Sequence, residues 1–480
     1  MTSGPAGALE GRLGRMAIDA RGPRRMDPLE AGFYSSEDEH LLLHVGGIAV
    51  FDGRVDFTAL VERIERRITE LPGLRQVVVP LPFDIARPTW EDDPHFDLLS
   101  HLRRFEVPPP GTDHELKEAV SEFWSWQLDR RKPLWDLTLL EGLEGGRSAL
   151  LFKAHRAALD PRAIGRLGQL FLDDQPIASD PGSPPPFHPR PMSGMIVRVA
   201  EALVDRLTTL PRRVTAAALQ LLDRQALVSS VTRLGGLLES VATLLSTPAP
   251  ETPINGSLGE TRRLGWVRLS LDVVRGIEGT LGGTVDDAIL TIVADALGRY
   301  LRSRGRATDD LYLTSLVEPL GVREADTHLL ASLTVGPLSP AARHAVVRSG
   351  ATRAGQYRLD GLDAIASLLA TLPGGLRRAL SSLAFQAVNT ICIDLPALGG
   401  PLYATGQKLR FVAPIVPLTW NVGLSFCVLA YAESEIVIGL QADAGHVPDL
   451  TPLEAAIQEA YLDLAATAGV PAIDPSRATA

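Results

Sequence analysis

The stretch Leu150-Leu-Phe-Lys-Ala-His-Arg-Ala-Ala-Leu-Asp-Pro161 decides the architecture of this 480-residue chain. An apolar run at residues 148–152 predicts a buried strand, and this strand delivers the basic pair His155 and Arg156. Asp160 and the proline after it then turn the chain toward a short helix. A strand that ends in a histidine, with an aspartate nearby, can set a general base in a cleft. Arg156 cannot be that base, because a guanidinium keeps its proton at any useful pH.

Length and composition predict a soluble globular protein of two domains. At 480 residues the chain exceeds the size of a single core, and 45% hydrophobic with 22% charged residues is an ordinary globular composition. The net charge of −10 argues against nucleic acid as a partner, because phosphate binding favours a basic surface. The two cysteines, Cys392 and Cys427, lie in apolar strand-like runs and are interpreted as buried thiols in a reducing compartment.

The chain has no apolar run of the roughly 20 residues that a membrane-spanning helix needs. Residues 1–25 are rich in Gly, Ala and Arg and lack a continuous apolar core, so we expect a disordered arm rather than a secretory signal. The expected location is therefore the cytoplasm, with any contact to a membrane or lipid droplet being peripheral.

Strands alternate with helices in both halves, which predicts two mixed α/β domains at residues 26–175 and 254–480. In the first half we expect helices at residues 56–71 and 115–128 and strands at 41–51, 75–79, 133–141 and 148–152, with Gly145-Gly146 as a hairpin turn. In the second half we expect strands at residues 264–271, 311–316, 388–395, 408–416, 423–431 and 435–442, and helices at 273–281, 285–301 and 453–468.

Residues 176–253 are interpreted as a Pro-rich and helical linker between the domains. Residues 176–191 are rich in Pro, Ser and Gly, and residues 192–245 form a long helical region with a broad apolar stripe. The stripe fits an interfacial helix that meets a membrane or lipid droplet. It also fits a hairpin packed on the two domains, which is the usual role of such a stripe and the interpretation we favour.

Three blocks of the sequence resemble the bacterial wax ester synthase/acyl-CoA:diacylglycerol acyltransferase family, a branch of the CoA-dependent acyltransferases. The central stretch resembles the family's His-His-x-x-x-Asp-Gly motif, residues 86–104 resemble an early block with Trp and His-Leu-Arg-Arg, and residues 128–136 resemble its Pro-Leu-Trp-Glu block. The resemblance extends from Met26 to Leu464. It implies two chloramphenicol-acetyltransferase-like domains with a tunnel between them, and acyl-CoA as a co-substrate without any further cofactor.

The central motif departs from the family pattern at the residue that matters most. Aligned on the first histidine, the chain keeps His155 and Asp160, but Arg156 stands where the family has its general base. Acyl transfer to an alcohol needs a group that takes the hydroxyl proton, and neutral histidine suits this task. Neighbouring side chains of a strand point to opposite faces, so His155 is misplaced as a substitute unless the local register changes. Arg156 and Asp160 are expected to pair in the pocket.

Other family positions have changed as well. The resemblance implies substrate-binding roles for Trp135, Asp286, Asp287, Asp394 and Ser425. Asp286-Asp287 stands where the family has Asn-Asp, Asp394 lies in the segment that replaces Ser-Asn-Val-Pro-Gly-Pro, and Ser425 replaces an asparagine. The histidines elsewhere in the chain show no metal-ligand spacing, so we expect no metal site.

Three functional hypotheses follow from these residues. In the first, the chain is a divergent family member, weak or inactive in O-acyl transfer, that still binds acyl-CoA, lipids or an active homologue. In the second, it is a working acyltransferase for diacylglycerol or long-chain alcohols, with His155 or a water-mediated route replacing the base. In the third, it acts in natural-product lipid assembly. The identity of Arg156 favours the first hypothesis over the second.

Overall fold

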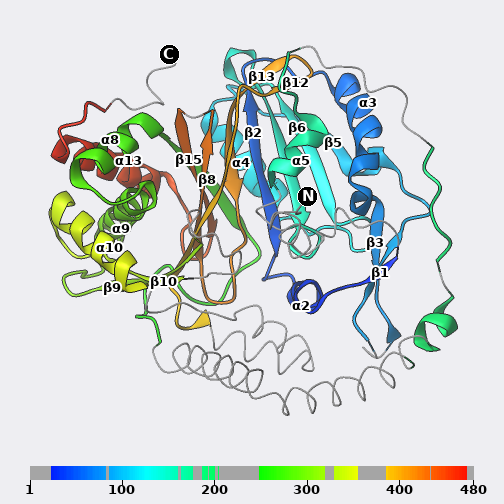
Figure 1. Ribbon diagram of the computed structural model, residues 1–480, viewed down its shortest axis with the longest axis horizontal. Coiled ribbons are helices and arrows are strands. Elements are labelled where there is room, and N and C mark those ends of the chain that lie inside the picture. The colour runs from blue at the N-terminus through cyan, green and yellow to red at the C-terminus, as the bar shows by residue number, and fades with distance from the viewer. Residues whose placement is uncertain are drawn as a thin grey trace, which may run out of the picture.

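The computed structural model describes residues 23–82, 86–159, 164–176, 186–192, 194–200, 204, 248–318, 329–354, 385–432 and 434–472. Two six-stranded mixed sheets form the frame of the molecule (Figure 1). This arrangement confirms the predicted α/β class with two mixed-sheet domains. Asp160, most of the linker at residues 176–253 and residues 1–22 of the expected arm lie outside the described residues.

The first sheet has the strand order β12-β13-β2-β7-β6-β5. Its strands are β2 (His44–Phe51), β5 (Leu102–Glu106), β6 (Trp135–Glu141), β7 (Ser148–His155), β12 (Tyr403–Ala404) and β13 (Gln407–Ile415). β5 and β6 are parallel, and every other neighbouring pair in this sheet is antiparallel. Gly145 and Gly146 have φ angles of 74° and 72° in the connection from β6 to β7, so the predicted hairpin uses glycine where the backbone is left-handed.

The second sheet has the strand order β10-β9-β11-β14-β15-β8. Its strands are β8 (Arg262–Ser270), β9 (Tyr312–Glu318), β10 (Leu329–Thr334), β11 (Thr390–Leu398), β14 (Leu424–Tyr431) and β15 (Glu435–Asp443). β11 runs parallel to both of its neighbours, β9 and β14, while the other pairs are antiparallel. Such a mixed sheet needs long connections between its parallel strands, and helices supply part of them.

Helices flank the two sheets (Figure 1). The described helices are α2 (Pro28–Ser36), α3 (Phe57–Arg67), α4 (Asp113–Ser125), α5 (Ile164–Phe171), α8 (Leu271–Leu281), α9 (Val285–Ser303), α10 (Pro340–Ala354) and α13 (Thr451–Thr467). α9 is buried on nearly all sides, because α8, α10 and α13 surround it beside the second sheet. Of the described helices, none is both long and apolar enough to cross a membrane.

A small antiparallel sheet of β1 (Arg24–Arg25), β4 (Thr89–Asp92) and β3 (Gln76–Val79) lies beside the first domain. Arg24 and Arg25 belong to the segment that we expected to be a disordered arm, so the ordered chain begins earlier than predicted. The cause is local: Arg24 and Arg25 pair with Trp90 and Thr89, and the Arg24 guanidinium binds Glu30.

The seam between the domains is formed by elements from both halves of the chain. β13 forms as predicted, but it pairs with β2 in the first sheet rather than closing the second one. Ser121 and Ser125 of α4 accept hydrogen bonds from backbone N–H groups of β8, at Leu264 (2.9 Å) and Arg262 (2.8 Å). The boundary between sequence segments at residue 254 therefore does not coincide with the boundary between the two sheets.

The core of each domain is apolar, and both cysteines belong to it. Cys392 and Cys427 are free thiols and are buried, as predicted from their apolar surroundings. Burial raises the pKa of the Cys392 thiol well above its usual value. Both cysteines thus behave as small core residues.

Gly439 of β15 lies tightly against β13 of the other sheet. A Cβ added at Gly439 would lie 1.8 Å from the carbonyl oxygen of Pro414 in β13, which is backbone that cannot rotate away. We expect Gly439→Ala to lower the free energy of unfolding by about 2 kcal/mol or more, since overpacking at a rigid contact costs this much. Urea unfolding measures the change.

Gly279 provides the matched control, because a Cβ there meets nothing within 4 Å on the exposed side of α8. Gly279→Ala is expected to leave stability unchanged or to raise it by up to about 1 kcal/mol through helix propensity. Equal stability of the Gly439→Ala variant and the natural protein would show that the sheets do not press on each other at this point.

Candidate active site

The candidate site is organised by β7, whose residues are all buried. Leu150, Phe152 and Ala154 pack into one apolar cluster, which continues into the second domain. Ala149 and Leu151 pack into another cluster, on the opposite side of the sheet. The alternation along the strand therefore places His155 on the same face as Ala149 and Leu151, and Arg156 follows in the turn after β7.

His155 is held on both of its ring nitrogens. Its Nδ1 accepts a hydrogen bond from the backbone N–H of Ala157 (2.9 Å), which leaves the ring proton on Nε2. Nε2 lies 3.4 Å from the Oε2 atom of Glu37, and the side chain is fully buried. The ring also makes an edge contact with Tyr34. The His155 ring is thus turned into the protein rather than toward a cleft.

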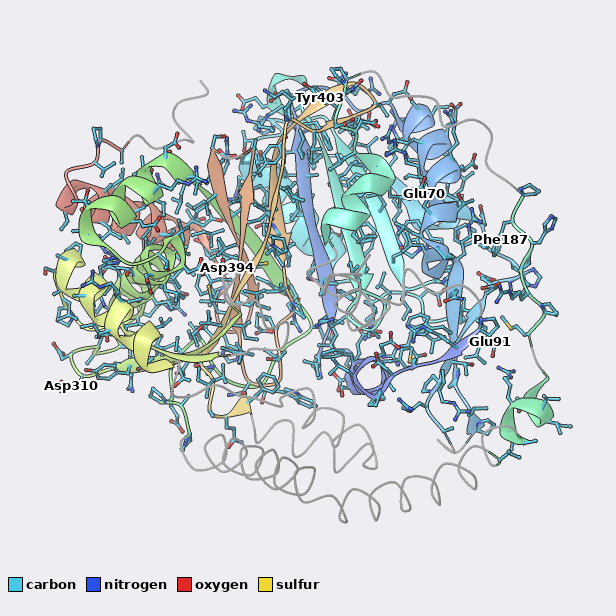
Figure 2. The ribbon with its side chains drawn as sticks, viewed as in Figure 1. Glu70, Glu91, Phe187, Asp310, Asp394 and Tyr403 are labelled. Carbon is cyan, nitrogen blue, oxygen red and sulfur yellow. The ribbon has the colours of Figure 1, made fainter. Side chains whose placement is uncertain are left out.

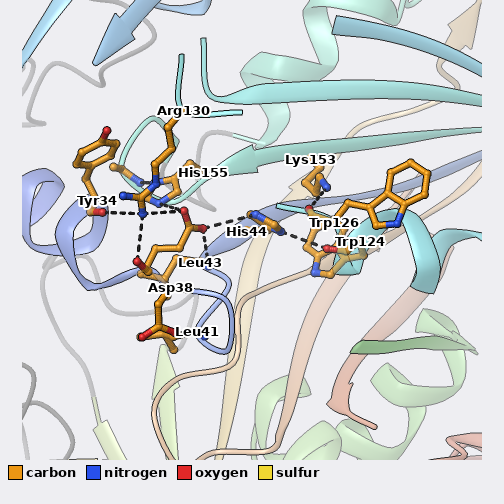
Figure 3. A network of polar contacts seen from close by, with 12 residues as sticks. Tyr34, Asp38, Leu41, Leu43, His44, Trp124, Trp126, Arg130, Lys153 and His155 are labelled. Carbon is orange, nitrogen blue, oxygen red and sulfur yellow. Dashed lines mark hydrogen bonds and ion pairs between the residues drawn. The ribbon is translucent and has the colours of Figure 1, made fainter. Parts of the chain in front are cut away.

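The Glu37 carboxylate contacts His44, Arg130 and His155. Figure 3 shows how these three partners lie in the polar network. Glu37 follows α2, and its carboxylate accepts hydrogen bonds from the Arg130 guanidinium (3.0 Å) and from the backbone N–H of Leu43 (3.2 Å). Burial opposes ionisation of Glu37, but His155 and Arg130 outweigh burial and hold the pKa of this carboxyl well below its usual range. The network therefore contains a buried carboxylate that stays charged.

His44 faces the same carboxylate from β2. Its Nε2 lies 3.6 Å from Oε1 of Glu37, and its Nδ1 lies 3.3 Å from the carbonyl oxygen of Trp124. Complete burial, reinforced by the charge of Lys153, lowers the pKa of His44 to about 3. His44 is therefore neutral in the folded protein at physiological pH.

Lys153 is the third polar side chain on this face of the strand pair. Its ammonium donates to the carbonyl oxygens of Phe123 (2.8 Å) and Trp126 (2.6 Å), at the end of α4. Burial lowers its pKa to about 8, and the charge of Asp136 opposes that shift. Lys153 thus caps a helix C-terminus, where a cation is favourable.

Arg156 leaves the strand in another direction. Its backbone N–H donates to the carbonyl oxygen of Leu43 (2.7 Å), and its half-buried guanidinium lies 4.8 Å from the ring centre of Phe33 in α2. The NH1 group also contacts the carbonyl oxygen of Leu159 at 3.4 Å. The expected partner Asp160 lies outside the described residues, so the predicted ion pair stays a prediction.

An apolar cavity of about 40 Å³ lies on the Phe152 face of β7, between this strand and α5. Residues of both sheets line it, including Leu398 of β11 and Val412 of β13. A tunnel was expected between the domains, but a cavity of this size is far smaller than the several hundred Å³ of a typical ligand site. A groove of about 1010 Å³ lies at the other end of the strands, where Asp52 and Arg147 line it, and it does not include the motif.

Two of the predicted substrate-binding residues in the second domain contact each other. Asp286 in the first turn of α9 and Asp394 of β11 share a side-chain hydrogen bond. Burial raises the pKa of both carboxyls, and the charge of Asp286 raises that of Asp394 further. One of them must carry a proton to form this bond. Within the described part of the chain, no hydrogen bond or ion pair links them to His155 or Arg156.

The other three predicted substrate-binding residues make structural contacts. Asp287 accepts from Thr284 at the start of α9 in a capping box. The hydroxyl of Ser425 donates to the carbonyl oxygen of Val416 (3.1 Å). The indole of Trp135 donates to the carbonyl oxygen of Leu74 (2.8 Å) and stacks on His101.

Sequence reasoning missed the Glu37 network. His44 was grouped with scattered histidines, although β2 pairs with β7 so that His44 lies directly opposite His155. Glu37 stands in a polar run that is typical of a solvated loop. The signal that was available is the pair of buried strands that each carry a histidine at the same end of the sheet. In the described residues, no group of three or more His, Cys, Asp or Glu side chains could hold a metal ion.

Comparison with known families matches most of the chain. The model of the wax ester synthase/diacylglycerol acyltransferase catalytic domain matches residues 26–289, and the model of the corresponding C-terminal domain matches residues 359–465. A probable diacylglycerol O-acyltransferase of Mycobacterium tuberculosis, tgs1, is 26% identical over 461 residues, which are 91% of this chain and 95% of that protein.

Solved structures show the same fold. The wax ester synthase/diacylglycerol acyltransferase of Marinobacter aquaeolei has a TM-score of 0.67 at 23% identity, with 93% of this chain and 100% of that one covered. The starter condensation domain of rhizomide synthetase RzmA, a mutant crystallised with C8-CoA and Leu-SNAC, has a TM-score of 0.55 at 11% identity, with 98% and 100% covered. At these identities the likeness concerns the fold.

The Glu37 network makes a testable contribution to stability at neutral pH. We expect Glu37→Gln to lower the free energy of unfolding by about 2 kcal/mol at pH 7, because a buried charge-assisted network loses its anion. The pKa of Glu37 is lower in the folded protein than its ordinary value of 4.5, so its stabilisation is present above that pH and is lost as the pH falls. The gap between the free energies of unfolding of the variant and the natural protein should therefore begin to narrow below about pH 4.5 and keep narrowing as the pH falls.

Glu39 is the control for this experiment, because its side chain is 72% exposed only two residues further on. Glu39→Gln should leave the stability curve nearly unchanged at every pH. Parallel curves for Glu37→Gln and the natural protein down to pH 3, measured by urea unfolding, would contradict the role assigned to the carboxylate.

Proposed function

The chain belongs to the wax ester synthase/diacylglycerol acyltransferase family, and we propose that it is a divergent member, weak or inactive in O-acyl transfer from acyl-CoA. In this proposal it retains the binding of acyl-CoA or lipids, or of an active homologue, at a cytoplasmic site or at the surface of a lipid droplet. The observation that carries the proposal is Arg156 at the position of the family's general base. A permanent guanidinium cannot accept the proton of an attacking hydroxyl.

The surroundings of His155 support the same conclusion. A general base needs an unprotonated nitrogen within hydrogen-bond reach of the substrate hydroxyl. The unprotonated nitrogen of His155 is Nδ1, and it already accepts the N–H of Ala157. Its other nitrogen faces a buried carboxylate that contacts Arg130 as well. For His155 to act as the base, the turn after β7 would have to open and expose Nδ1.

The apolar seam beside β7 supports the binding part of the proposal. The cavity of about 40 Å³ lies on the face of Leu150 and Phe152 in β7, the strand that ends just before Arg156. It is lined almost entirely by carbon, which suits an alkyl chain, and α5 forms one wall. A long acyl chain needs more room than this cavity has, so binding requires a displacement of that wall.

The test restores the missing base. Acyl transfer from a long-chain acyl-CoA to hexadecanol or a diacylglycerol is measured for the natural protein and for Arg156→His. We expect the natural protein to be silent or very slow, and Arg156→His to gain turnover by about 10²–10⁴, the usual contribution of a general base.

Two further variants separate the possible causes of a gain. Arg156→Gln removes the charge without supplying a base, so an equal gain in Arg156→Gln would mean that space or charge, rather than proton transfer, was limiting. His155→Ala tests the alternative base. The proposal is wrong if the natural protein turns over and His155→Ala, still folded by circular dichroism, abolishes that turnover.

A further inference from the structure

Arg75 is a buried arginine on the outer side of the first domain. It ends the 3-10 turn Pro72–Arg75 just before β3, and only 8% of the residue is exposed. Its backbone carbonyl accepts a hydrogen bond from the N–H of Asp93 (2.9 Å), which fixes the main chain at this point. The preceding residue, Leu74, is bonded through its own carbonyl to Trp135. The backbone that carries Arg75 is therefore held rigidly.

Two aromatic rings flank the Arg75 guanidinium. Its central carbon lies 4.5 Å from the ring centre of Phe187 and 5.8 Å from that of Phe96. The two rings are nearly perpendicular to each other, with their centres 6.5 Å apart. Figure 2 places Phe187 at the outer edge of the molecule, away from the seam between the sheets. Aromatic rings favour a cation but offer no acceptor to its N–H groups.

Arg75 differs from the other buried arginines in its lack of an anion. Among the described residues, Arg63, Arg262 and Arg343 are equally buried, and each contacts a carboxylate, of Asp173, Asp443 and Asp295 respectively. No described residue forms a hydrogen bond or ion pair with the Arg75 side chain, and Nε is buried without an acceptor. Burial lowers the pKa of Arg75, and no neighbouring charge offsets this shift.

The nearby carboxylate of Asp92 is engaged elsewhere. It accepts hydrogen bonds from the Gln76 side-chain amide (3.1 Å) and from the backbone N–H of Arg190 (3.1 Å). The second of these bonds anchors the segment that carries Phe187. The terminal nitrogens of Arg75 are not among the buried atoms that lack a partner, so they remain in contact with solvent. They are the part of the Arg75 side chain that an anion from solution would meet.

We propose that Arg75, with Phe96 and Phe187 beside it, is a binding site for an oxyanion, a phosphate or carboxylate group. A guanidinium presents a planar fork of donors that matches these groups, and burial strengthens the resulting charge-assisted bonds. The two rings receive the apolar or aromatic remainder of the ligand. The site lies apart from the Arg156 region and does not depend on whether that region is active.

The binding test uses inorganic phosphate as the first probe. We expect phosphate to raise the melting temperature of the natural protein and to bind in calorimetry, with an affinity at least about tenfold weaker in Arg75→Met. Arg75→Lys keeps the positive charge but lacks the planar pair of donors, so its affinity for phosphate should lie between those of the natural protein and Arg75→Met. Arg190→Met is the control, since Arg190 is exposed on the same segment, and it should bind phosphate as the natural protein does.

Octyl phosphate and adenosine 3′,5′-bisphosphate then identify the source of the anion. If octyl phosphate binds more tightly than inorganic phosphate, the natural ligand is a lipid headgroup. If the bisphosphate binds more tightly, the natural ligand is a nucleotide. If all three bind equally, the natural ligand is free phosphate.

The melting temperature without phosphate distinguishes an anion-binding site from an arginine that only stabilises the fold. An unpaired buried charge does not stabilise a fold, so Arg75→Met should melt no lower than the natural protein in the absence of anions. The proposal is overturned if Arg75→Met and the natural protein bind phosphate equally, or if neither binds it. It is overturned equally if Arg75→Met and Arg75→Lys both melt well below the natural protein while phosphate stabilises none of them.

Discussion

β7 ends at His155, and the turn that follows it gives two adjacent basic residues different contacts. His155 points into a polar network under α2, while Arg156 leaves the strand toward Phe33. A one-residue shift in register would move His155 to the other face, and it would also drive Phe152 and Leu150 out of their apolar cluster. The burial of that cluster therefore fixes the position of His155, and the turn that begins at Arg156 follows from it.

The Glu37 carboxylate is the electrostatic counterpart of this geometry. It lies between two buried imidazoles and accepts from Arg130, which belongs to the segment that precedes β6. The network therefore ties α2, β2, β7 and that segment together at one end of the first sheet. A buried anion of this kind is costly without hydrogen-bonded and cationic partners, and Glu37 has both, so the network supports this end of the sheet. His155 is part of that support.

Much of the fold could be predicted from hydrophobic periodicity. β2, β6, β7, α3, α4 and α9 were each foreseen, because their patterns are long and their capping residues are local. The placement of β13 in the first sheet could not be foreseen, since strand order depends on contacts between distant segments. The contact between Asp286 and Asp394 could not be predicted either, because the two residues are far apart in the sequence and each departs from the family pattern on its own.

The candidate site was predictable only in part. The burial of β7 and the face on which His155 lies follow from a period of two, which the sequence displays. Glu37 and Arg75 were not found, because charged residues in polar or turn-forming segments look solvated, and their burial arises from tertiary packing. A buried charge is therefore best recognised in the folded structure, by counting its partners.

The most direct test of the account is the fate of a bound thioester. The natural protein is incubated with a long-chain acyl-CoA and an excess of hexadecanol, and both the acyl-CoA held by the protein and the free CoA thiol are quantified. The account predicts that the protein holds acyl-CoA and returns it intact, with no thiol released above the buffer control. Release of CoA thiol together with hexadecyl ester, in repeated turnovers, would contradict it.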